Sequence, residues 1–135
     1  MAFVNEEIPP KDKAKIDTDK MKKMAGIYHS SDPYRWAIDR ERDVFLMYLW
    51  GGGPEIPTFY SLCAQGEIAV FNASWRGEGN KYTGVQLWCT VSNLRVSEAL
   101  QPRINEIKEL IREGLDEHCE FADRNYVTNV NVEFQ

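Results

Sequence analysis

Two hydrophobic patterns divide the chain, and each predicts a different secondary structure. Between residues 35 and 91, short segments rich in β-branched and aromatic residues are separated by charged or turn-forming residues, which is typical of β-strands. Between residues 97 and 121, apolar residues recur at spacings of three and four, which is the period of an amphipathic helix. We therefore expect a sheet with a helix packed on it.

The segments that predict strands follow one another along the chain at 35–39, 44–50, 58–65, 67–75, 83–91 and, after the helix, 126–134. Segment 83–91 alternates apolar and polar residues, so we expect one face of this strand to contact the core. Segment 44–50 is apolar at every position, which predicts a central strand that is covered on both sides.

The two ends of the chain predict helices of different kinds. The apolar stripe within 97–121 is formed by Leu100, Ile104, Ile107, Leu110, Ile111 and Leu115. Pro102 is expected in the first turn of this helix, where its missing N–H costs least. Residues 1–26 are rich in lysine, and Asp17 or Thr18 is a suitable N-cap for a short helix that runs through Met24 and ends at Gly26.

These patterns together predict an α+β fold. We expect an antiparallel meander of about six strands, with one long C-terminal amphipathic helix on one face. Residues 1–26 are expected to form an N-terminal arm, docked or mobile, and residues 27–135 a single domain.

The charge of the chain narrows the classes of partner. The net charge is −5 and the pI is about 5.1, whereas proteins that bind nucleic acid need clustered Lys and Arg. No apolar run is long enough to cross a membrane, and the first residues do not resemble a secretory signal. We therefore expect a cytoplasmic protein that binds neither nucleic acid nor membrane.

The residues that most often carry nucleophilic or metal chemistry are few and scattered. The three cysteines, Cys63, Cys89 and Cys119, have no CxxC spacing, so we expect buried free thiols. His29 lies in an expected loop, and His118 precedes Cys119 at the acidic end of the helix. Because a closed zinc site needs four ligands and no second Cys/His cluster exists, we expect no metal site and no cofactor.

Two further segments bear on catalysis. Gly51-Gly52-Gly53 is followed by neither a helix nor a Lys-Ser/Thr pair, which favours a connection between strands over a phosphate-binding loop; a ligand-facing loop is the alternative. Residues 39–43 alternate acidic and basic side chains, which predicts local ion pairs in a turn rather than a catalytic pair of carboxylates. The sequence therefore favours a protein that is not an enzyme.

Two groups of residues are candidates for binding a partner. Trp75 and Trp88 are expected on the sheet face opposite the helix, with Arg76 in the polar rim of that face. The alternative is that the arm and loops cover the two tryptophans. The second group consists of four carboxylates near the C-terminal end of the helix: Glu113, Asp116, Glu117 and Glu120. The helix dipole disfavours negative charge at that end, so a partner that carries positive charge would explain them; a role in solubility is the alternative.

The first hypothesis on function is therefore a small acidic module that inhibits or regulates a protein partner with a basic surface, as a monomer or a homodimer. An immunity protein that neutralises a bacterial toxin would suit this size and charge. The first alternative is a small-ligand-binding or enzymatic domain that uses the Gly51–Gly53 loop and the aromatic sheet face. The second alternative is a structural subunit of a larger assembly.

Overall fold

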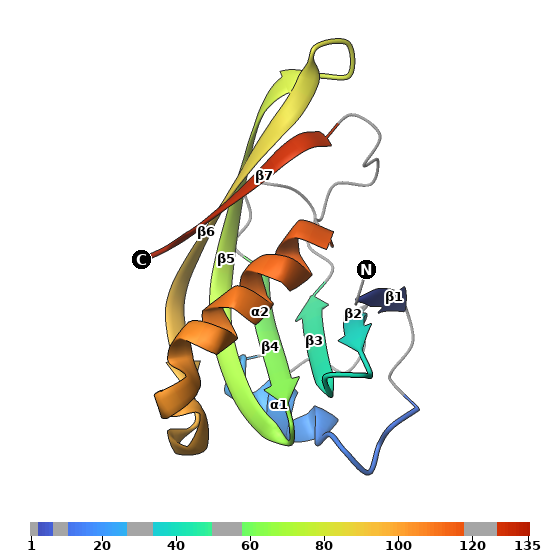
Figure 1. The fold of residues 1–135 in the computed structure, drawn as a ribbon, viewed down its shortest axis with the longest axis vertical. Helices are drawn as coiled ribbons and strands as arrows, with labels where there is room; N and C mark the ends of the chain where they lie inside the picture. Colours follow the sequence, from blue (N-terminus) through green and yellow to red (C-terminus); the bar gives the residue numbers. More distant parts are fainter. Residues whose placement is uncertain (1–2, 7–10, 27–33, 50–57, 118–126) are drawn as a thin grey trace.

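The computed structural model describes residues 3–6, 11–26, 34–49, 58–117 and 127–135 (Figure 1). Its single sheet has seven strands in chain order: β1 (Val4–Glu6), β2 (Tyr34–Asp39), β3 (Val44–Leu49), β4 (Thr58–Ala64), β5 (Glu67–Asn80), β6 (Gly84–Val96) and β7 (Val127–Phe134). The helical segments are α1 (Thr18–Met24), the 3₁₀ helix η1 (Glu98–Arg103) and α2 (Ile104–Glu117).

The predicted α+β class, with a mostly antiparallel sheet and a C-terminal helix, is confirmed, but two features of the sheet differ. The last strand, β7, runs parallel to β6, whereas the sequence predicted an antiparallel meander throughout. The helical connection carries the chain back before β7 begins, and such a crossover joins parallel neighbours. The short strand β1, which pairs with β2, was not predicted.

The predicted single long helix over 97–121 is confirmed only in part, and residues 118–121 lie outside the described residues. The segment begins with the six-residue η1, which contains Pro102, and α2 has fourteen residues. In an α-helix the proline ring clashes with the carbonyl group four residues earlier, so the α-helix starts only after Pro102. The apolar stripe still packs on the sheet, because Ile107, Leu110, Ile111 and Leu115 are buried.

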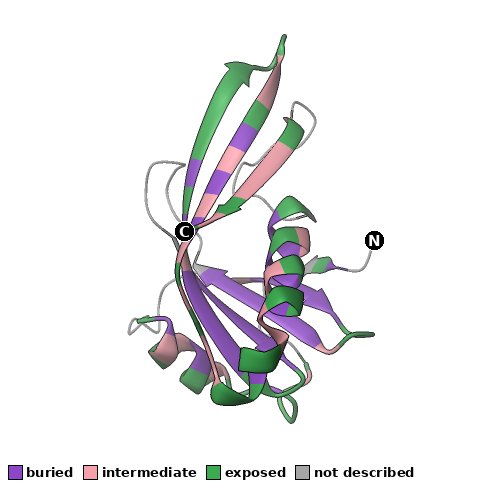
Figure 2. Cartoon of the chain, turned by 60° about the vertical axis from the view of Figure 1, so that its left-hand side comes forward, coloured by how far each residue is buried: buried purple, intermediate pink, exposed green. Residues whose placement is uncertain are grey.

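The sheet is covered on two faces. The buried side chains of α2 belong to one core. On the opposite face, a second core contains the buried residues of the N-terminal arm, which are Ile16, Met21 and Ala25. Strand β3 contributes to both cores, as predicted: Leu46 contacts the first and Met47 the second. Figure 2 shows the buried residues concentrated in β3 and its neighbouring strands.

The short helix of the arm forms as its sequence predicts. Asp17 is the N-cap of α1, and its side chain accepts a hydrogen bond from the backbone N–H of Lys20 at 3.0 Å. After the helix, Gly26 has a φ of +77°, a conformation that suits glycine at a helix end. Because Ile16, Met21 and Ala25 are buried in the second core, the described part of the arm is docked on the sheet.

The charged turn between β2 and β3 forms ion pairs, but these reach well beyond the turn. The guanidinium of Arg42 donates to both oxygens of Glu113 on α2, at 2.7 and 3.0 Å, and also pairs with the buried Asp39. Hydrogen bonds to Glu113 and Asp39 raise the pKa of Arg42. Arg40 donates to Asp12 of the arm at 3.0 Å. The turn therefore joins the sheet to α2 through Arg42 and to the N-terminal arm through Arg40.

Strands β5 and β6 extend past both helices as a long hairpin (Figure 1). The turn is fixed by Asn80, whose side-chain oxygen accepts from the backbone N–H groups of Tyr82 and Thr83 at 2.8 and 3.1 Å. Gly79 is required beside it, because a Cβ atom there would lie 2.1 Å from the carbonyl oxygen of Gly84. The sequence placed a loop from residue 76 onward, whereas β5 continues to Asn80.

Replacing Ile107 or Ile111 with alanine should lower the free energy of unfolding by about 2–5 kcal/mol, because either change leaves a cavity between α2 and the sheet. Both side chains have 0% exposure. Urea unfolding monitored by circular dichroism measures the effect, with Asn105→Ala on the exposed side of α2 as the control. An unchanged midpoint for the two isoleucine variants would show that this face of α2 is not buried.

The thiols of Cys63 and Cys89 should react slowly in the folded protein, because both are buried and burial raises the pKa of the Cys63 thiol. A Cys119→Ser variant isolates these two thiols, and Ser74→Cys adds an exposed thiol as a positive control. Ellman's reagent should label position 74 quickly and the native pair only after urea is added. Fast labelling of the native pair without urea contradicts the burial.

Candidate functional site

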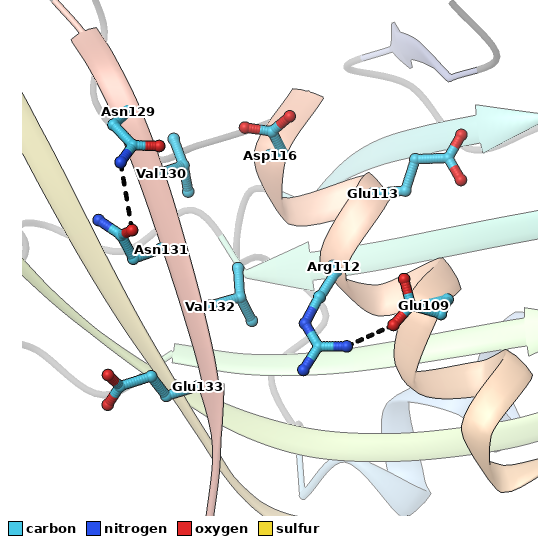
Figure 3. A pocket seen from close by; sticks show the side chains of 9 residues that line it. All are labelled: Glu109, Arg112, Glu113, Asp116, Asn129, Val130, Asn131, Val132 and Glu133. Carbon is cyan, nitrogen blue, oxygen red and sulfur yellow. Dashed lines mark hydrogen bonds and ion pairs between the residues drawn. The ribbon is translucent and has the colours of Figure 1, made fainter.

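A groove of about 760 Å³ runs between α2 and β7. Figure 3 shows the side chains that line it, which are Glu109, Arg112, Glu113 and Asp116 from α2 and Asn129, Val130, Asn131, Val132 and Glu133 from β7. Four of these side chains are carboxylates and one is a guanidinium. The groove is therefore polar, with an excess of negative charge.

The α2 wall of the groove follows from the helical period. Ile107 and Ile111 lie one turn apart and are both buried against the sheet. At 3.6 residues per turn, positions two or five residues away lie on the outer side of the helix. Glu109, Arg112 and Asp116 are exposed there. Arg112 forms an ion pair with Glu109, one turn earlier on the same helix.

The aromatic ring of Phe134 joins the two walls at one end of the groove. The guanidinium carbon of Arg112 lies 4.9 Å from the ring centroid, and the ammonium group of Lys108 lies 5.5 Å from it. Both distances are within the range of cation–π contacts. These contacts hold the C-terminal end of β7 against α2, while the groove extends from there toward Asn129.

The β7 wall presents different residues on its two faces. Val130 and Val132 pack against the core on the α2 face, and in the β6–β7 register they lie beside Leu87 and Cys89. Figure 3 shows both valine side chains directed toward α2. Asn131 lies on the other face, and its side-chain amide donates to the carbonyl oxygen of Leu87 at 3.2 Å.

The predicted acidic residues are only partly brought together. Glu113 and Asp116 line the groove, but Glu113 is also the partner of Arg42. The internal ion pair gives Glu113 a structural role, which the sequence analysis did not foresee. The side chain of Glu117 and the whole of Glu120 lie outside the described residues.

The predicted position of Trp75 was wrong. Trp75 is 2% exposed and belongs to the core under α2, where its indole N–H donates to the hydroxyl of Tyr60 at 3.3 Å. In the β5–β6 register Trp75 lies opposite Cys89, and residues directly opposite share a face. Trp75 therefore faces the same side as the core residue Cys89 and cannot contact a partner.

Arg76 and Trp88, in contrast, lie together on the face opposite α2. They are directly opposite in the β5–β6 register, and the guanidinium carbon of Arg76 is 4.6 Å from the Trp88 ring centroid. Arg76 also pairs with Glu78 at 2.7 Å. Both Arg76 and Glu78 are strand residues rather than loop residues. Trp88 therefore lies on the sheet face that was predicted for it.

Several residues that line the groove were not predicted from the sequence. Glu109 and Arg112 could have been found, because a spacing of three and then four places them in line with Asp116 on a helix. Glu133 and Asn131 could not, since their contribution depends on β7 returning beside α2. The sequence signal for β7, its alternating pattern, predicts a strand and no particular neighbour.

Other candidates for chemistry fall partly outside the structure. Gly51–Gly53, His29, His118 and Cys119 lie outside the described residues. Within the part of the chain that the structure describes, no group of three His, Cys, Asp or Glu side chains could hold a metal ion. In the same part, no helix combines the length and apolar character needed to cross a membrane.

The side chains that line the groove offer negative charge and hydrogen-bonding groups. Arg76 and Trp88 add an aromatic surface on the far side of β6. Comparisons of the chain with protein-family models, with curated proteins and with solved structures find no match.

Proposed function

We propose that the protein is a small binding module that inhibits or regulates a protein partner with a basic surface. The observation that supports this proposal is the charge of the α2–β7 groove, which has four carboxylates and one guanidinium in its walls. Two cations, Arg112 and Arg42, pair with Glu109 and Glu113. Acidic side chains therefore outnumber basic ones in the lining of the groove, and an excess of negative charge would attract cationic groups of a partner.

The placement of this charge also favours binding. The last turn of α2 has no basic residue, although basic residues there would stabilise the helix through its dipole. The chain as a whole carries a net charge of −5. Acidic groups that do not stabilise their own helix are explained if they steer a cationic partner toward the groove.

The Arg76–Trp88 pair adjoins this groove across a single strand. Trp88 lies beside Asn131 in the β6–β7 register, and Asn131 lines the groove. Tryptophan and arginine are favoured at the energetic centres of protein interfaces. A partner that wraps around β7 would contact the carboxylates on one side and the indole on the other.

An inhibitor of a cationic bacterial toxin, acting in the cytoplasm, is one form of this function that suits the size and charge of the chain. The enzymatic alternative depends on the Gly51–Gly53 loop, outside the described residues, and stays a prediction. The structural-subunit alternative also stays a prediction.

Neutralising two groove carboxylates, Glu109→Gln with Asp116→Asn, should slow association with the natural partner about tenfold at low salt, because steering depends on these charges. Glu113 is left unchanged because its ion pair with Arg42 joins α2 to the β2–β3 turn, whereas the pair of Glu109 with Arg112 lies within α2. The control variant, Glu67→Gln with Glu98→Gln, removes the same charge from exposed positions outside the groove.

The partner is first isolated by affinity capture and purified, and association is then measured by stopped flow at low and high salt. The wild type and the control should lose rate as salt is added, and the groove variant should lose much less. Equal association rates for all three proteins at low salt would exclude the groove as the binding surface.

A further inference from the structure

Strand β7 lies at an edge of the sheet. Within the residues that the structure describes, β6 is the only strand beside it. β7 has eight residues, which extend about 26 Å at about 3.3 Å per residue. An edge strand presents backbone N–H and C=O groups that can pair with another extended chain.

The hydrogen bonding of β7 shows which of its backbone groups point outward. The backbone N–H of Gln135 donates to the carbonyl oxygen of Val91 on β6 at 2.8 Å. Successive residues of a strand direct their backbone groups to opposite sides, so those of Asn131 and Glu133 also point toward β6. The groups of Val130 and Val132 then point away from β6, along the side of β7 that the groove follows.

We propose that β7 pairs with an extended, basic peptide segment of the partner, which joins the sheet as an eighth strand in the α2–β7 groove. This inference rests on the proposed function and names the form of the bound segment. Strand addition of this kind takes its affinity from main-chain hydrogen bonds and its specificity from alternate side chains.

The two faces of β7 indicate what pattern the bound segment would have. Side chains of an added strand alternate between the faces of the sheet, as those of β7 do. Every second side chain would therefore lie on the α2 face, near the carboxylates of Glu109 and Asp116. Lysine or arginine at these positions is complementary to the groove, and the intervening positions would lie on the face of Asn131 and Glu133.

A second copy of this chain is a less suitable occupant of the same edge. Pairing β7 with another β7 would bring a second set of α2 carboxylates to the α2 face and a second Glu133 to the opposite face. Like charges placed opposite each other in a sheet destabilise the pairing. The charge of the groove therefore favours a basic segment from a different protein.

The test uses fluorescently labelled nonapeptides and the full chain, with binding measured by fluorescence polarisation. One peptide alternates lysine and threonine, and a second has the same composition with all lysines before all threonines. Both carry the same charge, so a purely electrostatic site would bind them equally. We expect the alternating peptide to bind about tenfold more tightly, because only it directs all its lysines to one face.

N-methylation of the alternating peptide tests the main-chain hydrogen bonds. One version is methylated at the lysine nitrogens and the other at the threonine nitrogens. Because alternate N–H groups of an added strand point toward β7, one version should lose binding about tenfold or more and the other should retain it. Loss in the lysine version indicates antiparallel pairing, and loss in the threonine version indicates parallel pairing.

A variant of β7 tests the same bonds from the protein side. Val132→Pro removes an outward-pointing N–H and should abolish binding, whereas Val132→Ala, which keeps the N–H, should preserve it. Proline is tolerated where the N–H of an edge strand faces outward, and circular dichroism checks the fold of both variants. The methylated peptides use the wild-type chain, so the proposal can be overturned even if the proline variant does not fold.

The outcomes separate this inference from the proposed function. Equal binding of the alternating and block peptides, with loss in the Glu109→Gln, Asp116→Asn variant, would overturn strand addition and leave the acidic binding module standing. Failure of both peptides to bind would overturn both. A dimer of the wild type that Val132→Pro converts to a monomer, seen by sedimentation, would assign the edge to a second copy and overturn the inference.

Discussion

Burial of the apolar face of α2 is the constraint on which the rest of the structure depends. To cover Ile107 and Ile111, the helix must lie across the sheet, and Gly114 allows it to lie close, since a Cβ atom there would be 3.1 Å from the Leu46 side chain. The chain therefore returns as a crossover, and β7 enters beside β6 in the same direction. The outer side of α2 and the new edge strand then form the two walls of the acidic groove.

Coverage of the opposite face decides which surfaces remain for recognition. Helix α1 packs on the second core through Met21, and Arg40 ties the arm to the β2–β3 turn. The hairpin of β5 and β6 extends past both helices, and Figure 2 shows exposed residues along its outer part. The surfaces that we propose for partner binding, the pair of Arg76 with Trp88 and the outer edge of β7, therefore lie where neither helix covers the sheet.

The sequence predicted the features that local periodicity determines and missed those that depend on the tertiary arrangement. Strands β2 to β7, the N-cap at Asp17 and the buried stripe of α2 follow from local sequence patterns. The ion pair of Arg42 with Glu113 joins residues 71 positions apart, so no local pattern reveals it. Trp75 was grouped with Trp88 by residue type, whereas its alternation with Ala73 places it in the core.

Amide hydrogen exchange along β7, measured residue by residue by NMR, tests the central claim most directly. In the free protein, the N–H groups of Val130 and Val132 should exchange faster than those of Asn131 and Glu133, because only the latter point toward β6. Saturation with the alternating lysine–threonine peptide should slow exchange at Val130 and Val132. Equal protection of all four amides in the free protein, or no change at the two valines when peptide is bound, would contradict the account.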